Sequence, residues 1–365
     1  MKVKLEDVCE KGTSNLKLSE VVGKSGDYPV YGAAGYIGDV DFYHQDKPYV
    51  AVVKDGAGIG RTILLPAKSS VIGTMQYLLP KDNVLPEYLN YVVRYMHLEK
   101  YFSGATIPHI YFRDYKNEEF NLEHLDRQEE IIGILGKLEK IIDIRQKELE
   151  ELDILTSARF VEMFGTYPEN EKGWSTGTIR DLVTEVRYGS SRKAADGDSG
   201  KYPYLRMNNI TYGGELDLTD TKTIDVPDEE LEKCTVRRGD LLFNRTNSKE
   251  LVGKTCVYNR DEMMVLAGFV VRVRLNEKAL PEFVSAFMNT DFTKQMLLGM
   301  CKAAIGQANI NAQELQNIGI YIPPVSLQKE FVGFKNQIDK SKAAVQRSLD
   351  ETQLLFDSLM QEYFG

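Results

Sequence analysis

The sequence has little that points to a membrane, a secreted scaffold or a metal site. No apolar run in its 365 residues reaches the ~18–20 residues of a membrane span, and the first twenty residues contain no signal-peptide core. The cysteines stand far apart without a CxxC pair, and the histidines show no metal-ligand spacing. We therefore expect a cytoplasmic protein with reduced thiols, no zinc site and no association with a membrane. These residues are Cys9, Cys234, Cys256 and Cys301, and His44, His97, His109 and His124.

Catalytic motifs are equally scarce. The glycine-rich stretch Gly56–Gly60 lacks the GK[ST] of a Walker loop and the third-glycine spacing of a dinucleotide site, so we expect a glycine turn there. The Pro-Pro pair at 323–324 lacks the flanking Asn or Asp and aromatic residue of an adenine methyltransferase loop. No glycine-rich S-adenosylmethionine loop and no Ser/His/Asp or paired-carboxylate arrangement is present. We expect a non-enzymatic chain that holds no cofactor of its own.

Excess positive charge is also missing, since the formal net charge is -9. More than half of the negative excess lies in residues 121–165, which carry 6 Lys and Arg against 11 Asp and Glu, and the remaining segments are nearly neutral. Nearly neutral domains attract DNA poorly without regard to its sequence. Either the protein does not bind DNA, or a basic partner helps it to do so.

The sequence does contain an internal duplication. Residues 117–165 align with 317–365 without a gap at a constant offset of 200, and 12 of these 49 positions are identical. With a length that suggests two or more domains, this predicts two half-molecules in tandem, each a globular domain followed by a helix. The identical residues in the first copy are Asn117, Gln128, Glu130, Gly133, Lys140, Gln146, Leu149, Glu151, Leu155, Glu162, Phe164 and Gly165.

The helical part of each copy has heptad spacing, and no proline lies between residue 127, or its counterpart 327, and the final glycine. Arg127–Phe164 would form a helix of roughly 57 Å, and an apolar stripe that long needs a partner. We predict an antiparallel coiled coil of the two copies; the alternative is that each helix packs only on its own domain. The predicted seam comprises Ile131, Leu135, Leu138, Ile142, Leu149 and Leu152 in the first copy, and Phe331, Ile338, Val345, Leu349, Phe356 and Leu359 in the second.

The segments before each helix are predicted to be mixed α+β domains. Both open with a short strand and a helical turn, continue with short β-type runs separated by turns, and pass through Leu-Pro-Glu into one amphipathic helix. The predicted helices are Tyr88–Phe102 and Phe283–Leu298. The small and polar stretches that follow end at Ile110 and Ile310, again 200 residues apart.

Four phrases, YPVYGAAGYIG, YPYLRMNNITYGGELDL, RRGDLLFNRTNSKELVGKTCVY and YIPPVSLQKEFV, resemble the target-recognition domains and conserved helical regions of type I restriction–modification specificity subunits. The resemblance covers essentially the whole chain, although NLEHLDRQEEI lacks the prolines of the second copy. It implies recognition domains at 1–120 and 166–325, helical regions at 121–165 and 326–365, and a bipartite double-stranded DNA target. It also implies as partners two DNA adenine methyltransferase subunits and restriction/translocase subunits, with S-adenosylmethionine, ATP and Mg on the partners.

Side chains whose polar groups suit base edges gather where predicted strands end in loops. We expect DNA contacts from this set; the alternative is that the asparagines form Asx turns and the arginines are solvated. In the first domain the candidates are Tyr36, Lys54, Arg61, Gln76, Thr106 and His109. In the second they are Arg187, Tyr188, Ser191, Arg192, Lys193, Arg206, Asn208, Asn209, Asn244, Arg245, Thr246, Asn247, Lys249, Gln307 and Asn309.

The combined prediction is a DNA-sequence reader that positions methyltransferase and restriction subunits. A type IIB or orphan modification system would use similar modules and is the nearest alternative. A coiled-coil adaptor that binds no DNA is an alternative of a different class.

Overall fold

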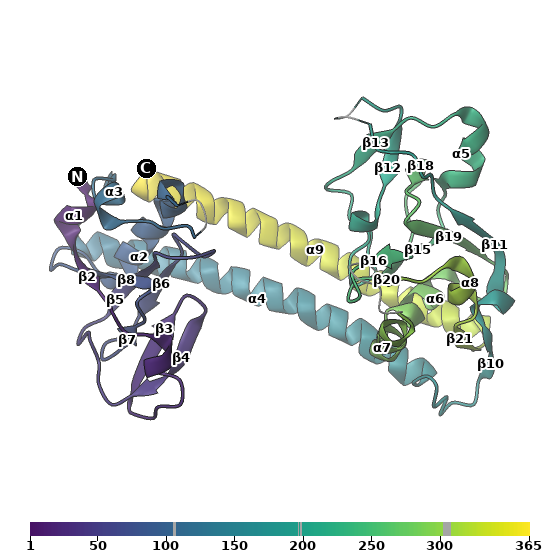
Figure 1. The fold of residues 1–365 in the computed structure, drawn as a ribbon, viewed down its shortest axis with the longest axis horizontal. Helices are drawn as coiled ribbons and strands as arrows, with labels where there is room; N and C mark the ends of the chain where they lie inside the picture. Colours follow the sequence, from purple (N-terminus) through teal and green to yellow (C-terminus); the bar gives the residue numbers. More distant parts are fainter. Residues whose placement is uncertain (105–106, 196, 198, 302–307) are drawn as a thin grey trace. The chain divides into compact units, whose positions relative to one another are not determined.

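The computed structural model describes residues 1–104, 107–195, 197, 199–301 and 308–365 (Figure 1). Its internal contacts divide the chain into two compact units, one formed by 1–147 with 345–365 and the other by 148–344. Two helices of 40 residues, α4 (Leu125–Phe164) and α9 (Val325–Phe364), contribute a segment to each unit. Each unit therefore consists of one globular domain with the beginning of one long helix and the end of the other.

The first unit has a four-stranded sheet in the order β2-β8-β5-β6, a three-stranded sheet β4-β3-β7 and the strand pair β1-β9. In the three-stranded sheet, β3 and β7 pair in parallel and β3 and β4 antiparallel. The elements are β1 (Lys2–Lys4), α1 (Leu5–Val8), β2 (Cys9–Thr13), η1 (Leu18–Glu20), β3 (Tyr28–Gly32), β4 (Gly35–Val40), β5 (Tyr49–Val53), β6 (Thr62–Leu65), β7 (Ser70–Val71), β8 (Met75–Pro80), α2 (Pro86–Tyr95), η2 (Leu98–Tyr101), α3 (Phe112–Tyr115) and β9 (Glu119–Asn121).

The second unit repeats this plan. Its sheets are β11-β19-β15-β17, β13-β12-β18-β14 with β12 parallel to β18, and the pairs β10-β21 and β16-β20. The elements are β10 (Ser175–Thr178), η3 (Ile179–Leu182), β11 (Val183–Tyr188), β12 (Tyr202–Leu205), η4 (Met207–Asn209), β13 (Lys222–Ile224), α5 (Asp228–Cys234), β14 (Thr235–Val236), β15 (Leu241–Asn244), β16 (Thr246–Asn247), β17 (Thr255–Val257), β18 (Met264–Leu266), β19 (Val270–Leu275), α6 (Pro281–Met288), α7 (Asp291–Met300), β20 (Ala308–Asn309), α8 (Ala312–Gln316) and β21 (Gly319–Ile322).

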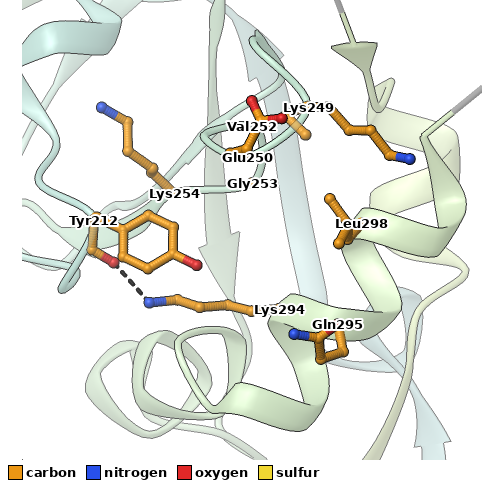
Figure 2. Close-up of a pocket in the computed structure, with 9 residues that line it drawn as sticks. All are labelled: Tyr212, Lys249, Glu250, Val252, Gly253, Lys254, Lys294, Gln295 and Leu298. Carbon is orange, nitrogen blue, oxygen red and sulfur yellow. Dashed lines mark hydrogen bonds between the residues drawn. The ribbon is translucent and has the colours of Figure 1, made fainter. Parts of the chain in front are cut away.

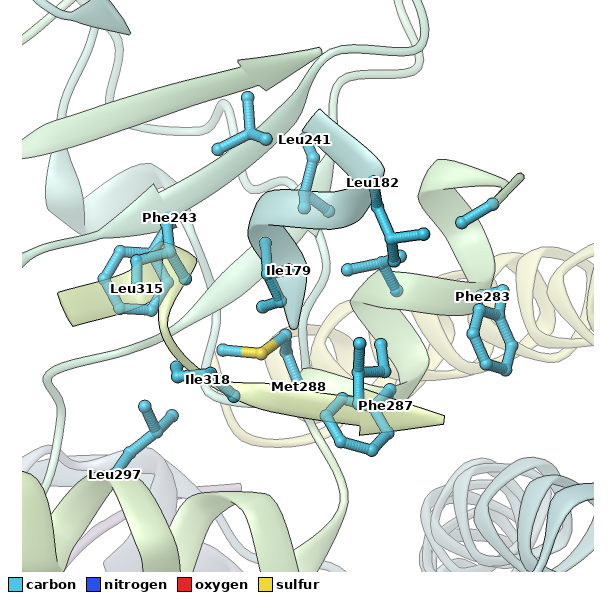
Figure 3. Packing of buried hydrophobic residues seen from close by; sticks show 14 of the residues in the cluster. Ile179, Leu182, Leu241, Phe243, Phe283, Phe287, Met288, Leu297, Leu315 and Ile318 are labelled. Atoms are coloured by element: carbon cyan, nitrogen blue, oxygen red, sulfur yellow. The ribbon is translucent and has the colours of Figure 1, made fainter. Parts of the chain in front are cut away.

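Each domain core closes on the end of the long helix that belongs to the other half of the chain. In the first unit the ring of Tyr88 lies edge-on to Phe364 of α9, with centroids 5.2 Å apart. In the second unit Phe283 lies in the same way against Phe164 of α4, at 4.9 Å. Figure 3 shows Phe283 within the second core, among apolar side chains from the sheet and the short helices. Burying these aromatic side chains fixes each helix end to its domain.

In both units the beginning of one long helix packs against the end of the other, so the segments run antiparallel. Ile131 and Leu135 share the first core with Phe356 and Met360, and Phe331 shares the second core with the end of α4. The twelve predicted seam residues are all buried or half-buried. A half-buried lysine, Lys342, lies between the seam residues Ile338 and Val345 of α9, and its ammonium group binds Asp153 at 2.7 Å and also Glu215.

A buried glutamine caps the same junction in each unit. Its side-chain oxygen accepts the backbone N–H of the residue before α2 or α6, and its amide donates to two backbone carbonyls of nearby loops. Three hydrogen bonds thereby satisfy backbone groups at the start of the short helix and near the start of the long one. Gln128 binds Leu85, Asn83 and Glu123 at 2.9, 3.0 and 2.9 Å, and Gln328 binds Leu280, Lys278 and Pro323 at 2.8, 3.0 and 2.9 Å.

The prediction of one amphipathic helix before each long helix is wrong in detail. In the second unit the expected helix is two helices, because Asn289 ends α6 and the hydroxyl of Thr290 accepts a hydrogen bond from the Thr293 backbone to begin α7. In the first unit α2 ends at Tyr95, and η2 follows after His97, whose φ is 50°. The short helix α5 was also not expected.

Candidate nucleic-acid interface

Some candidate residues of the two domains lie at one equivalent position, directly after β5 and β15, which are inner strands of the sheets β2-β8-β5-β6 and β11-β19-β15-β17. The backbone N–H of Ile110 donates to the carbonyl of Lys54 at 3.0 Å, and that of Ile310 donates to Arg245 at 2.9 Å. Beside them, Asp55 bridges His109 in the first unit and Thr246 pairs with Asn309 in the second. We call these the strand-end corners: Lys54, Asp55 and His109 in the first unit, and Arg245, Thr246 and Asn309 in the second.

The first corner is a charged cluster. The Asp55 carboxylate accepts from the Lys54 ammonium at 2.5 Å and from Nδ1 of His109 at 2.6 Å. Partial burial raises the pKa of Asp55, but the hydrogen bonds from Lys54 and His109 outweigh this effect and hold the pKa below its ordinary value. Lys54 and His109 were predicted from the sequence, whereas Asp55 was not. This arrangement orients partly exposed donors at the end of β5.

The second corner contains a stacked arginine. The guanidinium of Arg245 lies over the ring of Tyr188 at 5.0 Å from its centroid, and the Tyr188 hydroxyl accepts from the backbone N–H of Ala312 at 3.1 Å. Beside it, the Thr246 hydroxyl donates to the Asn309 side chain at 3.2 Å. The structure therefore brings four predicted residues from three distant segments of the chain onto one surface.

The other predicted arginines of the second domain are each paired with a carboxylate. The Nε of Arg187 donates to Glu185 at 3.1 Å, Arg192 binds Glu230 through two nitrogens, and Arg206 binds Asp220 at 2.8 Å. A DNA phosphate or base would have to compete with these acids. Such pairs favour a role in holding loops together over a role as the first contact with DNA.

Three predicted contacts are buried and hold the fold together, which corrects the prediction for them. Gln76 lies inside β8 and its amide donates to the carbonyl of Gly12 at 2.6 Å. Asn209 and Asn244 are also buried and bind backbone carbonyls with their amide groups. Asn247 is half-buried and its amide donates to the Asn244 side chain at 3.0 Å. The Asx-type alternative therefore describes these asparagines better than base contact does.

The remaining candidates lie at the surface or outside the described residues. Arg61 is exposed beside the Gly56–Gly60 turn, in which Gly56 and Gly60 have φ values of 92° and 83° that favour glycine. The hydroxyl of Tyr36, which is 60% exposed, donates to Asp39. The exposed remainder are Ser191, Lys193, Asn208 and Lys249. Thr106 and Gln307 lie outside the described residues.

A lysine-lined pocket of about 200 Å³ lies in the second domain, and of its three lysines only Lys249 was predicted from the sequence (Figure 2). Lys294 donates to the carbonyl of Tyr212 at 2.8 Å and lies over its ring, and Lys254 donates to the carbonyl of Met207 at 2.8 Å. Burial lowers the pKa of both lysines. Lys249 is exposed at the rim.

A second feature that the sequence did not predict is an ionic network on the sheet β11-β19-β15-β17. Arg272, with 2% of its side chain exposed, donates to Glu185 at 2.9 Å. Arg274 binds Glu185 and Asp240, both at 2.8 Å. Burial raises the pKa of Glu185, but its arginine partners outweigh this and lower it overall. Because Glu185 also binds Arg187, the network anchors β11, the strand that ends at Tyr188.

Among the described residues, no group of three or more His, Cys, Asp and Glu side chains is arranged to hold a metal ion. None of the described helices combines the length and the apolar character that crossing a membrane requires.

Comparisons by sequence give consistent matches. A family model described as the type I restriction modification DNA specificity domain matches residues 1–153 and 171–351. The chain is 27% identical over 193 residues to the type I restriction enzyme EcoKI specificity subunit of Escherichia coli, covering 51% of this chain but only 41% of that protein. It is 23% identical over 314 residues to the MjaVIII specificity subunit of Methanocaldococcus jannaschii, covering 80% and 72% of the two chains.

Comparisons by structure show the fold. The S subunit of a type I restriction-modification system from M. genitalium superimposes with a TM-score of 0.63 and 14% identity, covering 100% of this chain and 96% of that one. A chain from a structural study of type I R-M complex assembly gives a TM-score of 0.58 at 14% identity, covering 100% and 97%. The predicted fold class, two tandem mixed domains with two long antiparallel helices, is confirmed.

Proposed function

Because the chain belongs to the type I restriction modification DNA specificity domain family, we propose that it reads DNA sequence as the specificity subunit of a type I restriction–modification complex. The family match confirms the predicted resemblance. The observation that carries the proposal is the pair of strand-end corners, since two copies of one fold present donors and acceptors at the same position. Base edges are distinguished by such groups.

The target is bipartite and its two halves differ. Lys54, Asp55 and His109 offer an ammonium group and an imidazole around a carboxylate, whereas Arg245, Thr246 and Asn309 offer a guanidinium, a hydroxyl and an amide. Different groups in equivalent positions select different bases. The two long helices each contribute a segment to both units and so link the two domains.

The chain contributes recognition and no chemistry of its own. Methyl transfer and cleavage belong to adenine methyltransferase and restriction/translocase partners, which bind S-adenosylmethionine, ATP and Mg. The nearly neutral domains supply little non-specific attraction to phosphates, so these partners also supply much of the DNA affinity.

The long helices carry two equivalent sites for a protein partner. Ile154 and Leu155 on α4 are 67% and 47% exposed, and their counterparts Leu354 and Leu355 on α9, offset by 200 residues, are 72% and 48% exposed. Large aliphatic side chains gain free energy when a partner covers them. Two copies of one patch fit two copies of one methyltransferase subunit. The acidic composition of 121–165 favours a basic partner surface.

Mobility shift and methylome sequencing test the proposal. The chain is expected to bind duplex DNA weakly alone and sequence-specifically with its co-expressed methyltransferase, and the methylated sites should define an asymmetric bipartite target. Protection of no duplex in either state would favour a coiled-coil adaptor. Methyl transfer by the isolated chain would contradict a non-enzymatic role.

A further inference from the structure

Arg245 differs from the other predicted arginines of its domain in the groups that its guanidinium contacts. Arg187, Arg192 and Arg206 each bind a carboxylate. Within the described part of the chain, the Arg245 side chain has no carboxylate partner; its Nε is buried without a hydrogen bond, and the guanidinium stacks on Tyr188. A half-buried guanidinium with unused donors is costly unless a ligand completes its hydrogen bonds.

The orientation of Arg245 is fixed before any ligand arrives. Its backbone N–H donates to Phe269 and its carbonyl accepts from Ile310, which ties the residue to the sheet on both sides. Tyr188, on which the guanidinium lies, is held in turn by the Ala312 backbone. A stacked arginine presents a planar fork of donors with little freedom left to lose on binding.

We propose that Arg245, positioned by Tyr188, reads a guanine in the half-site of the second domain. This inference rests on the proposed function and extends it to one base. Two donors of a guanidinium match the O6 and N7 acceptors that guanine displays in the major groove. At the equivalent position of the first domain, Lys54 is a point charge bound to Asp55, so the same contact is not made there.

The alternative is that Arg245 binds a phosphate. Lys249, an exposed lysine four residues further along the chain, suits that role, because lysine ammonium groups bind phosphates without regard to sequence. The two readings differ in what the Arg245→Lys variant changes. Arg245→Lys keeps the positive charge and loses the planar fork of donors. If Arg245 reads a guanine, the variant should therefore lose base discrimination and keep the salt dependence of DNA binding.

The experiment uses the full chain with its methyltransferase partner. Wild type and Arg245→Lys are compared on the methylated target and on duplexes with each base pair of both half-sites replaced. For the wild type, replacing one guanine of one half-site should lower affinity between about 5-fold and about 150-fold. Arg245→Lys should lose this discrimination at that base pair alone, and Tyr188→Leu should weaken it at the same base pair. Arg238→Lys, an exposed arginine bound to Asp261, is the matched control and should change nothing.

The outcomes separate the two claims. A wild-type complex without any sequence preference would sink the proposed function itself. A sequence-specific wild type whose Arg245→Lys variant keeps every base preference, or loses affinity equally on all duplexes, would overturn the guanine contact and leave the proposed function standing. Loss of discrimination at a base pair that contains no guanine would also overturn the guanine contact and leave the proposed function standing.

Discussion

At the scale of single residues, the buried glutamines Gln128 and Gln328 identify the duplication more sharply than any apolar position. Both make three hydrogen bonds to backbone groups at the same junction. An apolar seam residue can be replaced by another of similar volume, but only an amide supplies one acceptor and two donors here. Their identity between the copies was visible in the sequence, and its cause becomes clear only in the folded chain.

Replacing either glutamine by alanine should destabilise its own unit. Gln128→Ala and Gln328→Ala each remove the side-chain partner of three backbone groups, which costs about 1–3 kcal/mol for each group that stays buried. Because the chain has two units, chemical denaturation should show that each variant shifts a different transition. Gln346→Ala, an exposed glutamine of α9, is the control and should change stability by less than about 0.5 kcal/mol. Equal shifts of both transitions by one variant would contradict independent units.

Glu185 should make the second unit sensitive to acid. Its folded pKa lies below the ordinary value of 4.5, so its contribution to stability is present above that pH and is lost as the pH falls through the folded pKa. At neutral pH, Glu185→Gln removes the carboxylate from buried Arg272 and should cost about 3 kcal/mol. Urea unfolding at pH 7 and at lower pH measures both effects.

The difference between wild type and Glu185→Gln should shrink on acidification, because the wild-type carboxylate becomes protonated. Glu232→Gln is the matched control, since the exposed Glu232 uses its backbone carbonyl and not its carboxylate toward Arg272. A difference between Glu185→Gln and wild type that is the same at every pH would show that the lost charge is not the cause.

At the scale of elements, the sequence predicts regular features well. Heptad spacing without proline predicted a helix from Arg127, and α4 begins two residues earlier, at Leu125. The break between α6 and α7 was missed because Thr290 caps a helix inside a continuous amphipathic pattern. α5 was missed because its sequence, DEELEKC, is dominated by charges and shows no apolar stripe.

Prediction of the site from residue type succeeded only in part. Asn244 and Arg245 are neighbours in one motif, yet Asn244 is buried and binds backbone carbonyls while Arg245 stacks on Tyr188. Adjacent residues of a strand point to opposite faces, and which face is covered depends on segments far away in the chain. Asp55, which orients Lys54 and His109, was missed because its partners come together only in the folded domain.

The two exposed aliphatic pairs of the long helices should each bind one partner subunit. Ile154→Ser with Leu155→Ser should remove one methyltransferase subunit from the complex, and Leu354→Ser with Leu355→Ser should remove the other. The stability of the chain should change little, because these side chains are exposed. Native mass spectrometry of the co-expressed complex gives the stoichiometry.

Leu18→Ser provides the control for these variants, since Leu18 is 52% exposed and lies in η1 of a recognition domain rather than in a long helix. It should leave two partner subunits bound. Retention of both subunits by both double variants would exclude these pairs as the docking sites.

At the scale of the whole molecule, each domain is completed by a helix end from the other half. Phe356, Met360 and Phe364 of α9 close the first core, and the equivalent positions in α4 are Thr156, Phe160 and Phe164. A chain consisting of residues 1–165 contains the first domain and a complete α4. Its helix end can therefore take the place of α9 only on a second copy of itself, which gives a symmetric dimer.

The half-length chain should form this dimer weakly, because Thr156 of α4 stands in the position of the buried Phe356, which packs near Tyr91. Thr156→Phe restores the aromatic ring, and since a buried phenylalanine contributes about 3–5 kcal/mol, the variant should lower the dissociation constant of the dimer at least about tenfold. Sedimentation at several concentrations measures both constants. With its methyltransferase partner, the dimer should modify a target whose two half-sites are identical and inverted, because both are read by Lys54, Asp55 and His109. A monomer at every concentration, for both variants, would mean that the equivalence of the two helix ends is not sufficient to close the first core.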